Sequence, residues 1–179
     1  QVYFIDNDEY FKQEDAFDDQ GKLYADNDER CIFFAKGIME TVKKLNWSPD
    51  VIHIQGWLGA LLPLYLRTYY KDEPIFYHTK TITCFLRPPF EGSLDSELLS
   101  KVGFDEITEK EAPELKEPHS MNLIKIAARY SDAITTIKGV LPQEAISYIE
   151  GTAKPFLYGE TIETTCKAYP QFYKELMSK

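Results

Sequence analysis

Hydrophobic residues in this chain form two kinds of run: short β-branched runs and longer runs with helical spacing. The short runs predict strands at residues 2–5, 51–54, 80–86, 133–137 and 155–157. The longer runs predict helices at residues 28–45, 121–130, 142–150 and 163–177, and one after Gly56 that ends at Arg67. Because strands and helices alternate, the sequence predicts an α/β fold with a mostly parallel sheet and helices on both faces.

The most periodic helix is expected at residues 28–45. Its apolar side chains recur at the spacing of one buried helix face, namely Cys31, Phe34, Ala35, Ile38, Val42 and Leu45. Polar and acidic residues open it, and they suit the positive end of a helix dipole, with Asp26 or Asn27 as the N-cap.

Two charged segments lie between the predicted elements. Residues 12–26 are charged and contain Gly21, so we expect an excursion over the surface. Residues 91–120 have no clear period, and only short helical pieces are expected there, near residues 94–102.

Residues 49–66 form the stretch around which the rest of the chain is organised. A short apolar strand stops at Gly56, and a long apolar run follows, which is the pattern of the first half of a βαβ unit. Ligands of such units bind beyond the carboxyl end of the strand. His53, Gln55 and Trp57 therefore lie where a site would be built.

Composition narrows the classes of function. The chain has 179 residues, enough for one domain, and its net charge of −9 disfavours nucleic acid and anionic membranes as partners. Its three cysteines are far apart and form no CxxC pair, so we expect buried free thiols in a reducing cytoplasm. No signal peptide and no apolar run of membrane-spanning length is found in the sequence.

Four local patterns resemble one known family. They are residues 2–11 as a strand and turn, residues 24–34 as "Y-x-D-N-x-x-R-F", residues 49–66 as "P-D-(V/I)-(V/I)-H-x-H-D-W…P-x-Y-L", and residues 132–136 as the strand "A-D-x-(V/I)-x-T-V-S". In order and spacing the chain resembles the N-terminal half of bacterial glycogen and starch synthases, which transfer glucose from ADP-glucose. The resemblance implies a Rossmann-like domain, the N-terminal half of a two-domain (GT-B) glycosyltransferase.

The departures from the family pattern concern its chemistry. The lysine- and glycine-rich loop "K-x-G-G-L" has no match, and in "H-x-H-D-W" the second His and the Asp are replaced by Gln55 and Gly56. The family's "T-I-H-N" ends here in Leu86 and Arg87. We expect residues 1–179 to be a single domain that lacks the family's first strand and has no second nucleotide-binding domain.

The resemblance assigns catalytic roles to His53 and Asp26. His53 would donate a hydrogen bond to a sugar hydroxyl, and the competing interpretation is a core histidine at the end of a strand. Asp26 would be the nearby carboxylate, and the competing interpretation is a helix N-cap that needs no ligand.

The substrate-binding candidates are Gln55, Gly56, Trp57 and Arg30. Gln55 can bind a hydroxyl but cannot act as an acid or base. Trp57 would stack on a sugar ring, as would the tyrosines of the following helix (Tyr65, Tyr69 and Tyr70), or all four rings belong to the core. Arg30 is either a site residue or an i, i+4 partner of Asp26.

Three hypotheses for function follow. The first is transfer of glucose from ADP-glucose to an α-1,4-glucan, with a further domain or a partner subunit. The second is a catalytically inactive glucan-binding or regulatory module of synthase ancestry, and the third is an unrelated domain that shares only the fold. No cofactor or metal is expected, since His78 and His119 lie far apart without ligand spacing. Any site should lie beyond the strands ending near Gln55 and Leu86.

Overall fold

The computed structural model describes residues 2–12 and 15–178. Its strands are β1 (Val51–Gln55), β2 (Lys80–Phe85), β3 (Ala133–Ile137) and β4 (Phe156–Gly159). Its α-helices are α1 (Asn27–Lys44), α2 (Leu62–Arg67), α3 (Leu98–Gly103), α4 (Ser120–Tyr130), α5 (Gln143–Gly151) and α6 (Ile162–Met177). Short 3₁₀ turns form η1 (Trp57–Gly59), η2 (Pro74–Phe76) and η3 (Pro113–Lys116).

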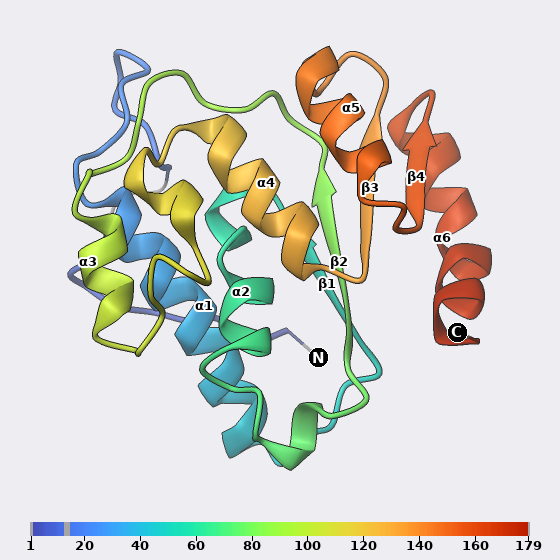
Figure 1. The fold of residues 1–179 in the computed structure, drawn as a ribbon, viewed down its shortest axis with the longest axis horizontal. Helices are drawn as coiled ribbons and strands as arrows, with labels where there is room; N and C mark the ends of the chain where they lie inside the picture. The colour runs from blue at the N-terminus through green and yellow to red at the C-terminus, as the bar shows by residue number, and fades with distance from the viewer. Residues whose placement is uncertain (1, 13–14, 179) are drawn as a thin grey trace.

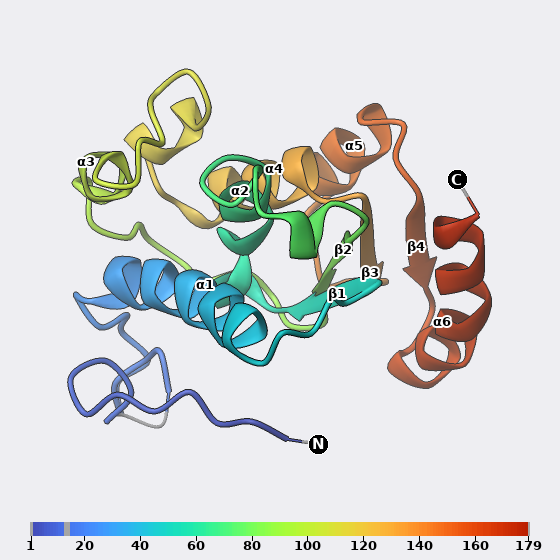
Figure 2. The same ribbon diagram turned by 90° about the horizontal axis from the view of Figure 1, so that it is seen from below.

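The strands form one parallel sheet in the order β1-β2-β3-β4 (Figure 1). Helices α2, α4 and α5 lie on one side of the strands, and α6 lies on the other (Figure 2). This arrangement confirms the predicted α/β, Rossmann-like fold with helices on both faces. Because all the strands run in the same direction, their carboxyl ends meet at one edge of the sheet.

The larger core lies on the side of α2 and α4. Ile54, Phe85 and Ile134 point into it from three strands and meet buried residues of α1, α2, α4 and α5. The leucines of α2 are almost fully buried, with Leu62 and Leu64 at 0 % exposure. This apolar core is the main source of the domain's stability.

The opposite side of the sheet has a much smaller apolar cluster. Only Ile82, Ala133 and Leu176 are buried in it, and Val51, Phe172 and Tyr173 pack around them. Helix α6 supplies the cover, yet of its side chains only Thr165 and Leu176 are buried.

Lys154, in the loop before β4, connects this part of the chain to α4. Its Nζ donates hydrogen bonds to the carbonyl oxygens of Ala128 at 2.9 Å and Ser131 at 2.7 Å, and also to that of Arg129. The last carbonyls of a helix lack intrahelical partners, and the helix dipole favours a cation there. Lys154 therefore caps α4 and fixes the position from which β4 enters the sheet.

The predicted strand at residues 2–5 is wrong. No strand of the described residues pairs with this segment, and Val2 and Phe4 are 79 % and 90 % exposed. Ile5 packs beside Gly37 of α1 instead. A β-branched run forms a strand only where a neighbour completes its hydrogen-bonded ladder, and local propensity cannot supply that neighbour.

Other predictions held with adjusted boundaries. The helix after Gly56 is delayed: the 3₁₀ turn η1 comes first, and α2 starts only at Leu62, with Pro63 in its first turn. The surface excursion at residues 12–26 includes residues 13 and 14, which lie outside the described residues. Its other residues are mostly partly buried or exposed and hold one isolated bridge, between Phe17 and Leu23.

The prediction for the cysteines was right for two of them. Cys31 and Cys84 are buried free thiols, whereas Cys166 is an exposed one. Burial raises the pKa of the Cys31 thiol well above its usual range. None of the helices within residues 2–12 and 15–178 combines the length and the apolar character that crossing a bilayer requires.

Candidate functional site

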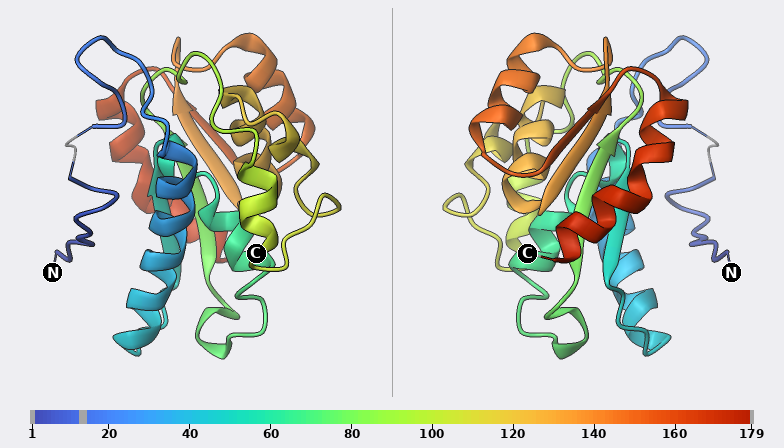
Figure 3. Two further views of the ribbon diagram at one scale, coloured as in Figure 1. Left: turned by 90° about the vertical axis from the view of Figure 1, so that its left-hand side faces the viewer. Right: turned by 90° about the vertical axis from the view of Figure 1, so that its right-hand side faces the viewer.

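A cavity of about 840 Å³ opens beyond the carboxyl ends of β1 and β2. Residues of the loop before α1 and of the loop after β2 line it, and Figure 3 shows both loops at the end of the sheet to which the strands point. Its wall includes the side chains Arg30, Gln55, Trp57, Arg87, Phe90 and Ser120. The cavity lies where parallel α/β sheets bind their ligands.

Gly56 lines the cavity and allows the chain to turn sharply there. Its backbone has φ 81° and ψ 170°, a combination that is essentially restricted to glycine. The Gly56 N–H donates to the carbonyl oxygen of Cys84 at 2.9 Å, which holds the end of β1 beside β2. The chain can therefore turn sharply out of the sheet into η1.

Trp57 forms an aromatic wall. Its ring centroid lies 4.6 Å from that of Phe90 and 6.4 Å from that of Phe17. The indole is partly buried against the main core and also lines the cavity. Trp57 therefore packs against the core and also presents a surface to the cavity.

Arg30 lines the cavity but is already engaged. It is 2 % exposed; its Nε donates to Asp26 Oδ2 at 3.0 Å, and a second nitrogen donates to the carbonyl oxygen of Asp15 at 3.0 Å. Its guanidinium also lies 5.1 Å from the ring centre of Tyr24. Arg30 therefore ties the loop before α1 to the helix.

Asp26 is the N-cap residue of α1, as the sequence predicted, but it does not cap the helix through its side chain. Its side chain makes no capping hydrogen bond, because its carboxylate is occupied by the i, i+4 ion pair with Arg30. That pair is the competing role that the sequence offered for Arg30. Asp26 does not line the cavity, so its catalytic role stays a prediction.

His53 points away from the cavity, toward α6. Its Nδ1 lies 2.5 Å from the hydroxyl of Tyr173, and its ring meets Tyr169 edge-on with centroids 4.8 Å apart. Its Nε2 is buried and has no hydrogen-bond partner within the described part of the chain. Burial lowers the pKa of His53, so the neutral imidazole is favoured. Its catalytic role also stays a prediction.

Tyr169 and Tyr173 complete a polar layer between α6 and the sheet. The Tyr169 hydroxyl lies 3.2 Å from Cys84 Sγ and 3.3 Å from Thr135 Oγ1. Burial raises the pKa of both tyrosines, so both stay protonated near neutral pH. The layer consists of neutral groups that hydrogen-bond to one another.

The tyrosines of the helix after Gly56 do not line this cavity. Tyr65 and Tyr70 are buried in the main core, and Tyr65 donates a hydrogen bond to Asp105 at 2.8 Å. Tyr69 is 48 % exposed and packs edge-on against Tyr70. None of these three tyrosines lines the cavity, so the structure does not support their predicted stacking on a sugar bound there.

Sequence reasoning gave no role to three residues of the cavity wall, Arg87, Phe90 and Ser120. Arg87 was visible as a cation directly after a predicted strand, at the edge where ligands bind. Ser120 opens α4, a position that only the folded chain brings close to β1 and β2. Within residues 2–12 and 15–178, no cluster of His, Cys, Asp and Glu could hold a metal ion.

Comparison with known proteins gives one consistent result. A family model described as the starch synthase catalytic domain matches residues 1–153. The chain is 32 % identical to the glycogen synthase of Elusimicrobium minutum over 137 residues, which are 76 % of this chain and 28 % of that protein.

Further relatives agree with this match. The glycogen synthase of Thermotoga maritima is 32 % identical over 143 residues, and that of Chlorobium limicola is 30 % identical over 148 residues. These alignments cover 80 % and 82 % of this chain, but only 28 % and 30 % of the respective relatives. The chain therefore spans less than a third of the length of the curated relatives it matches.

Proposed function

Because this chain belongs to the starch synthase catalytic-domain family, we propose that its cavity binds the acceptor end of an α-glucan. In the complete protein, the bound chain would receive glucose from ADP-glucose. Both substrates come from the family resemblance, and the relatives' names state glycogen synthase. The contribution of this chain is to hold the acceptor at the edge of the sheet.

One observation carries this proposal. The cavity joins an aromatic wall, made by Trp57 and Phe90, to polar side chains at the ends of two strands. Aromatic rings pack against the apolar C–H faces of sugars, and amide, hydroxyl and guanidinium groups bind their hydroxyls. Positioning of this kind is what a glycosyl acceptor needs before transfer.

Binding without transfer is the second candidate, and Gln55 is the residue that favours it. Gln55 stands where the family pattern has its second His, and an amide neither accepts nor releases a proton near neutral pH. Gly56 replaces the Asp of that pattern, and its backbone conformation would strain any other residue. His53, the remaining His, faces α6.

The first test uses the full-length gene product and two measurements on one sample. Co-sedimentation with glycogen measures binding, and incorporation of labelled glucose from ADP-glucose measures transfer. Sedimentation with transfer supports a working synthase, and sedimentation without transfer supports the binding module. A protein that stays in the supernatant at every glycogen concentration would refute the proposal.

A variant links the binding to the cavity. Trp57→Ala should weaken glycogen binding at least tenfold, roughly 1.4 kcal/mol. Trp47→Ala is the matched control, because Trp47 is 57 % exposed and precedes the opposite end of β1. Trp57→Phe, which keeps a ring, should retain part of the affinity, and circular dichroism would verify that each variant folds. Equal binding by Trp57→Ala and Trp47→Ala would exclude this cavity.

The proposal also places the protein in the cytoplasm, and it predicts that one substitution in the cavity raises transfer activity. A reducing cytoplasm suits the three free cysteines. If the amide of Gln55 limits the chemistry, Gln55→His should raise the rate of transfer per glycogen-bound protein. No gain in transfer, with binding intact, would indicate that this position does not limit the reaction.

A further inference from the structure

A second cavity, of about 670 Å³, lies on the outer side of α1. Its wall combines one side of α1 with Tyr10 from the N-terminal segment and with Lys101 and Phe104 from α3 and its end. No described residue lines both this cavity and the one beyond β1 and β2. We call the second cavity the α1 groove, and any function that it has is separate from the proposed function.

Helix α1 presents apolar side chains on two faces. Cys31, Ala35 and Met39 face the main core. The residues of α1 that line the groove have the spacing of a second helix face, namely Glu29, Ile32, Phe33, Lys36, Gly37 and Glu40. At the rise of an α-helix this face is about 16 Å long, or about three turns.

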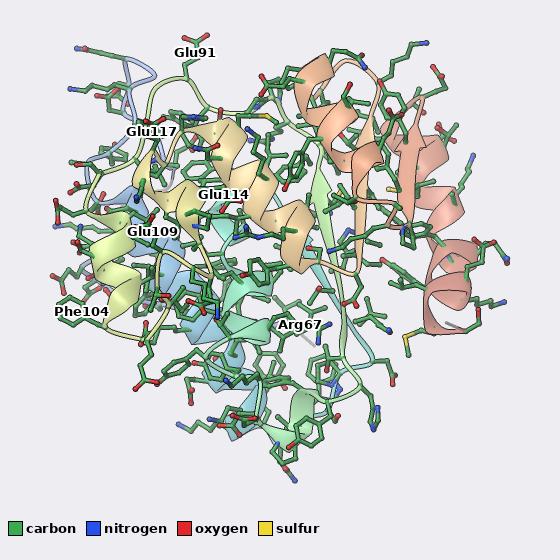
Figure 4. All side chains as sticks on the ribbon, viewed as in Figure 1. Arg67, Glu91, Phe104, Glu109, Glu114 and Glu117 are labelled. Carbon is green, nitrogen blue, oxygen red and sulfur yellow. The ribbon has the colours of Figure 1, made fainter. Side chains whose placement is uncertain are left out.

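The middle of the groove is apolar and open. Gly37 has no side chain, and Phe33 and Ile5 border the space that a Cβ would take there. Phe104 is 89 % exposed, and Figure 4 shows it at the end of α3, on the outside of the molecule. Tyr10 closes the groove against Phe33, with ring centroids 5.3 Å apart. Apolar side chains gathered in this way on a surface are typical of a binding site for another molecule.

Carboxylates already engage both cations of the groove wall. Lys101 Nζ lies 2.6 Å from Asp28 Oδ2 and 2.7 Å from Glu29 Oε1. Lys36 Nζ lies 2.5 Å from Asp105 Oδ1. The hydrogen bond from Lys101 is the main reason that the pKa of Glu29 lies below its usual range, so Glu29 is ionised at neutral pH.

Glu40 adds a negative charge at the other end of the groove. It is exposed, and its partner Lys43, at 3.5 Å, lies closer to Glu73, at 2.5 Å. Negative charge is therefore in excess along the groove, as it is in the whole chain, whose net charge is −9.

These properties indicate one kind of partner. A face about three turns long suits a helix laid along it, with apolar side chains in the middle and cations toward the acidic ends. A second copy of this chain would bring the same acidic groups against each other. An anionic lipid surface would be repelled in the same way.

We propose that the α1 groove docks an amphipathic helix of another protein, with an apolar stripe bordered by lysine or arginine. Phe104 and Phe33 contact the apolar stripe, and Glu29 and Glu40 attract the cations. The proposal does not depend on glucan binding.

Fluorescence anisotropy with the full-length protein and three labelled peptides tests the proposal. Each peptide has about 15 residues, long enough to form a helix. The first contains only Leu and Lys, with Leu at the spacing of one helix face. The second has the same composition in scrambled order, and the third has Glu in place of every Lys. The first should bind at least tenfold more tightly than either of the others, and its affinity should fall with added salt.

Two substitutions locate the peptide in the groove. Phe104→Ala should weaken binding of the striped peptide at least tenfold, and it should not disturb folding because the ring is exposed. Tyr77→Ala is the control, since Tyr77 is 60 % exposed and does not line the groove. Glu40→Gln should weaken binding at low salt more than at high salt. Its control is Glu150→Gln, at an exposed position of α5.

Several results would overturn the proposal. They are equal affinity for the striped and scrambled peptides, equal loss in Phe104→Ala and Tyr77→Ala, and no binding of the striped peptide, as expected if another segment of the same polypeptide covers the groove. A dimer that Phe104→Ala dissociates would assign the groove to a second copy instead. Glycogen binding should be the same in Phe104→Ala and wild type, so failure of this proposal leaves the proposed function standing.

Discussion

The two faces of the sheet are built differently, although the same strands supply both. Toward α2 and α4, Ile54 and Ile134 enter a large apolar core. Toward α6, the alternate residues His53, Cys84 and Thr135 meet the hydroxyls of two tyrosines. One face is held by burial of hydrocarbon, and the other by a small cluster and a layer of polar contacts.

Because of this difference, the two faces should contribute differently to global stability and to local opening. Apolar burial is non-directional and large, whereas a hydrogen bond between neutral groups contributes about 1 kcal/mol net and depends on geometry. Segments with few buried side chains open locally at lower free energy than the rest of the molecule. We therefore expect α6 to open before the core does.

The largest expected effect tests the core face. Ile134→Ala should lower the free energy of unfolding by about 2–5 kcal/mol, because Ile134 is 0 % exposed and its removal leaves a cavity. Urea denaturation followed by circular dichroism measures the change. Leu176→Ala, on the α6 face, should cost about 2 kcal/mol at most and mainly speed hydrogen exchange in α6. Equal global losses in both variants would remove the contrast between the faces.

Gly56→Ala tests the turn at which β1 leaves the sheet. Alanine fits the space, since no atom lies within 4 Å of the added Cβ, but it cannot adopt the backbone conformation without strain. We expect a loss of about 1–3 kcal/mol in unfolding free energy. Gly103→Ala is the control, because Gly103 also has open space but lies in α3 without positive φ. A neutral Gly56→Ala would mean that the turn relaxes.

Tyr173→Phe tests a single contact of the α6 face. The substitution removes the hydroxyl bonded to His53 and keeps the ring, so it should cost about 1 kcal/mol. Hydrogen exchange of the α6 amides would show whether the loss is local. An effect on the amides of α2 as large as on those of α6 would contradict independent faces.

The smallest expected effect is a pH dependence of the same contact. Burial lowers the pKa of His53, so the folded state favours the neutral ring. This contribution to stability is complete above about pH 6.5, the ordinary pKa of histidine, and decreases as the pH falls toward the lowered pKa of the folded state. Exchange in α6 should therefore accelerate between about pH 7 and 5, beyond the intrinsic pH trend.

His53→Phe provides the control for that measurement. The variant keeps an aromatic ring between β1 and α6 but cannot be protonated. Its α6 amides should show only the intrinsic pH trend. If wild type and His53→Phe responded alike, another group would be responsible.

Much of the fold could be predicted because hydrophobic period is a local property. The spacing in α1 and the β-branched runs of β1 and β3 determine which faces are buried before any partner is known. The segment at residues 2–5 shows the limit, since the same kind of run lies on the surface when no strand pairs with it.

The sequence indicated where the cavity lies, but not which side chains at the end of β1 would face it. The end of β1 borders the cavity, and Gln55, Gly56 and Trp57 all line it. The period of two places His53 and Gln55 on the same side of the strand. Sequence could not show that α6, about 120 positions away in the chain, would cover His53 and leave Gln55 open.

The contacts of Lys154 with α4 indicate that the folded domain extends beyond residue 153. The match to the family stops at residue 153, one position before the side chain that caps α4. A protein cut at that point would leave the last carbonyls of α4 without their cation and turn β3 into an exposed edge, which invites aggregation. In this chain, the end of the stretch that matches the family model and the end of the folded unit are therefore different.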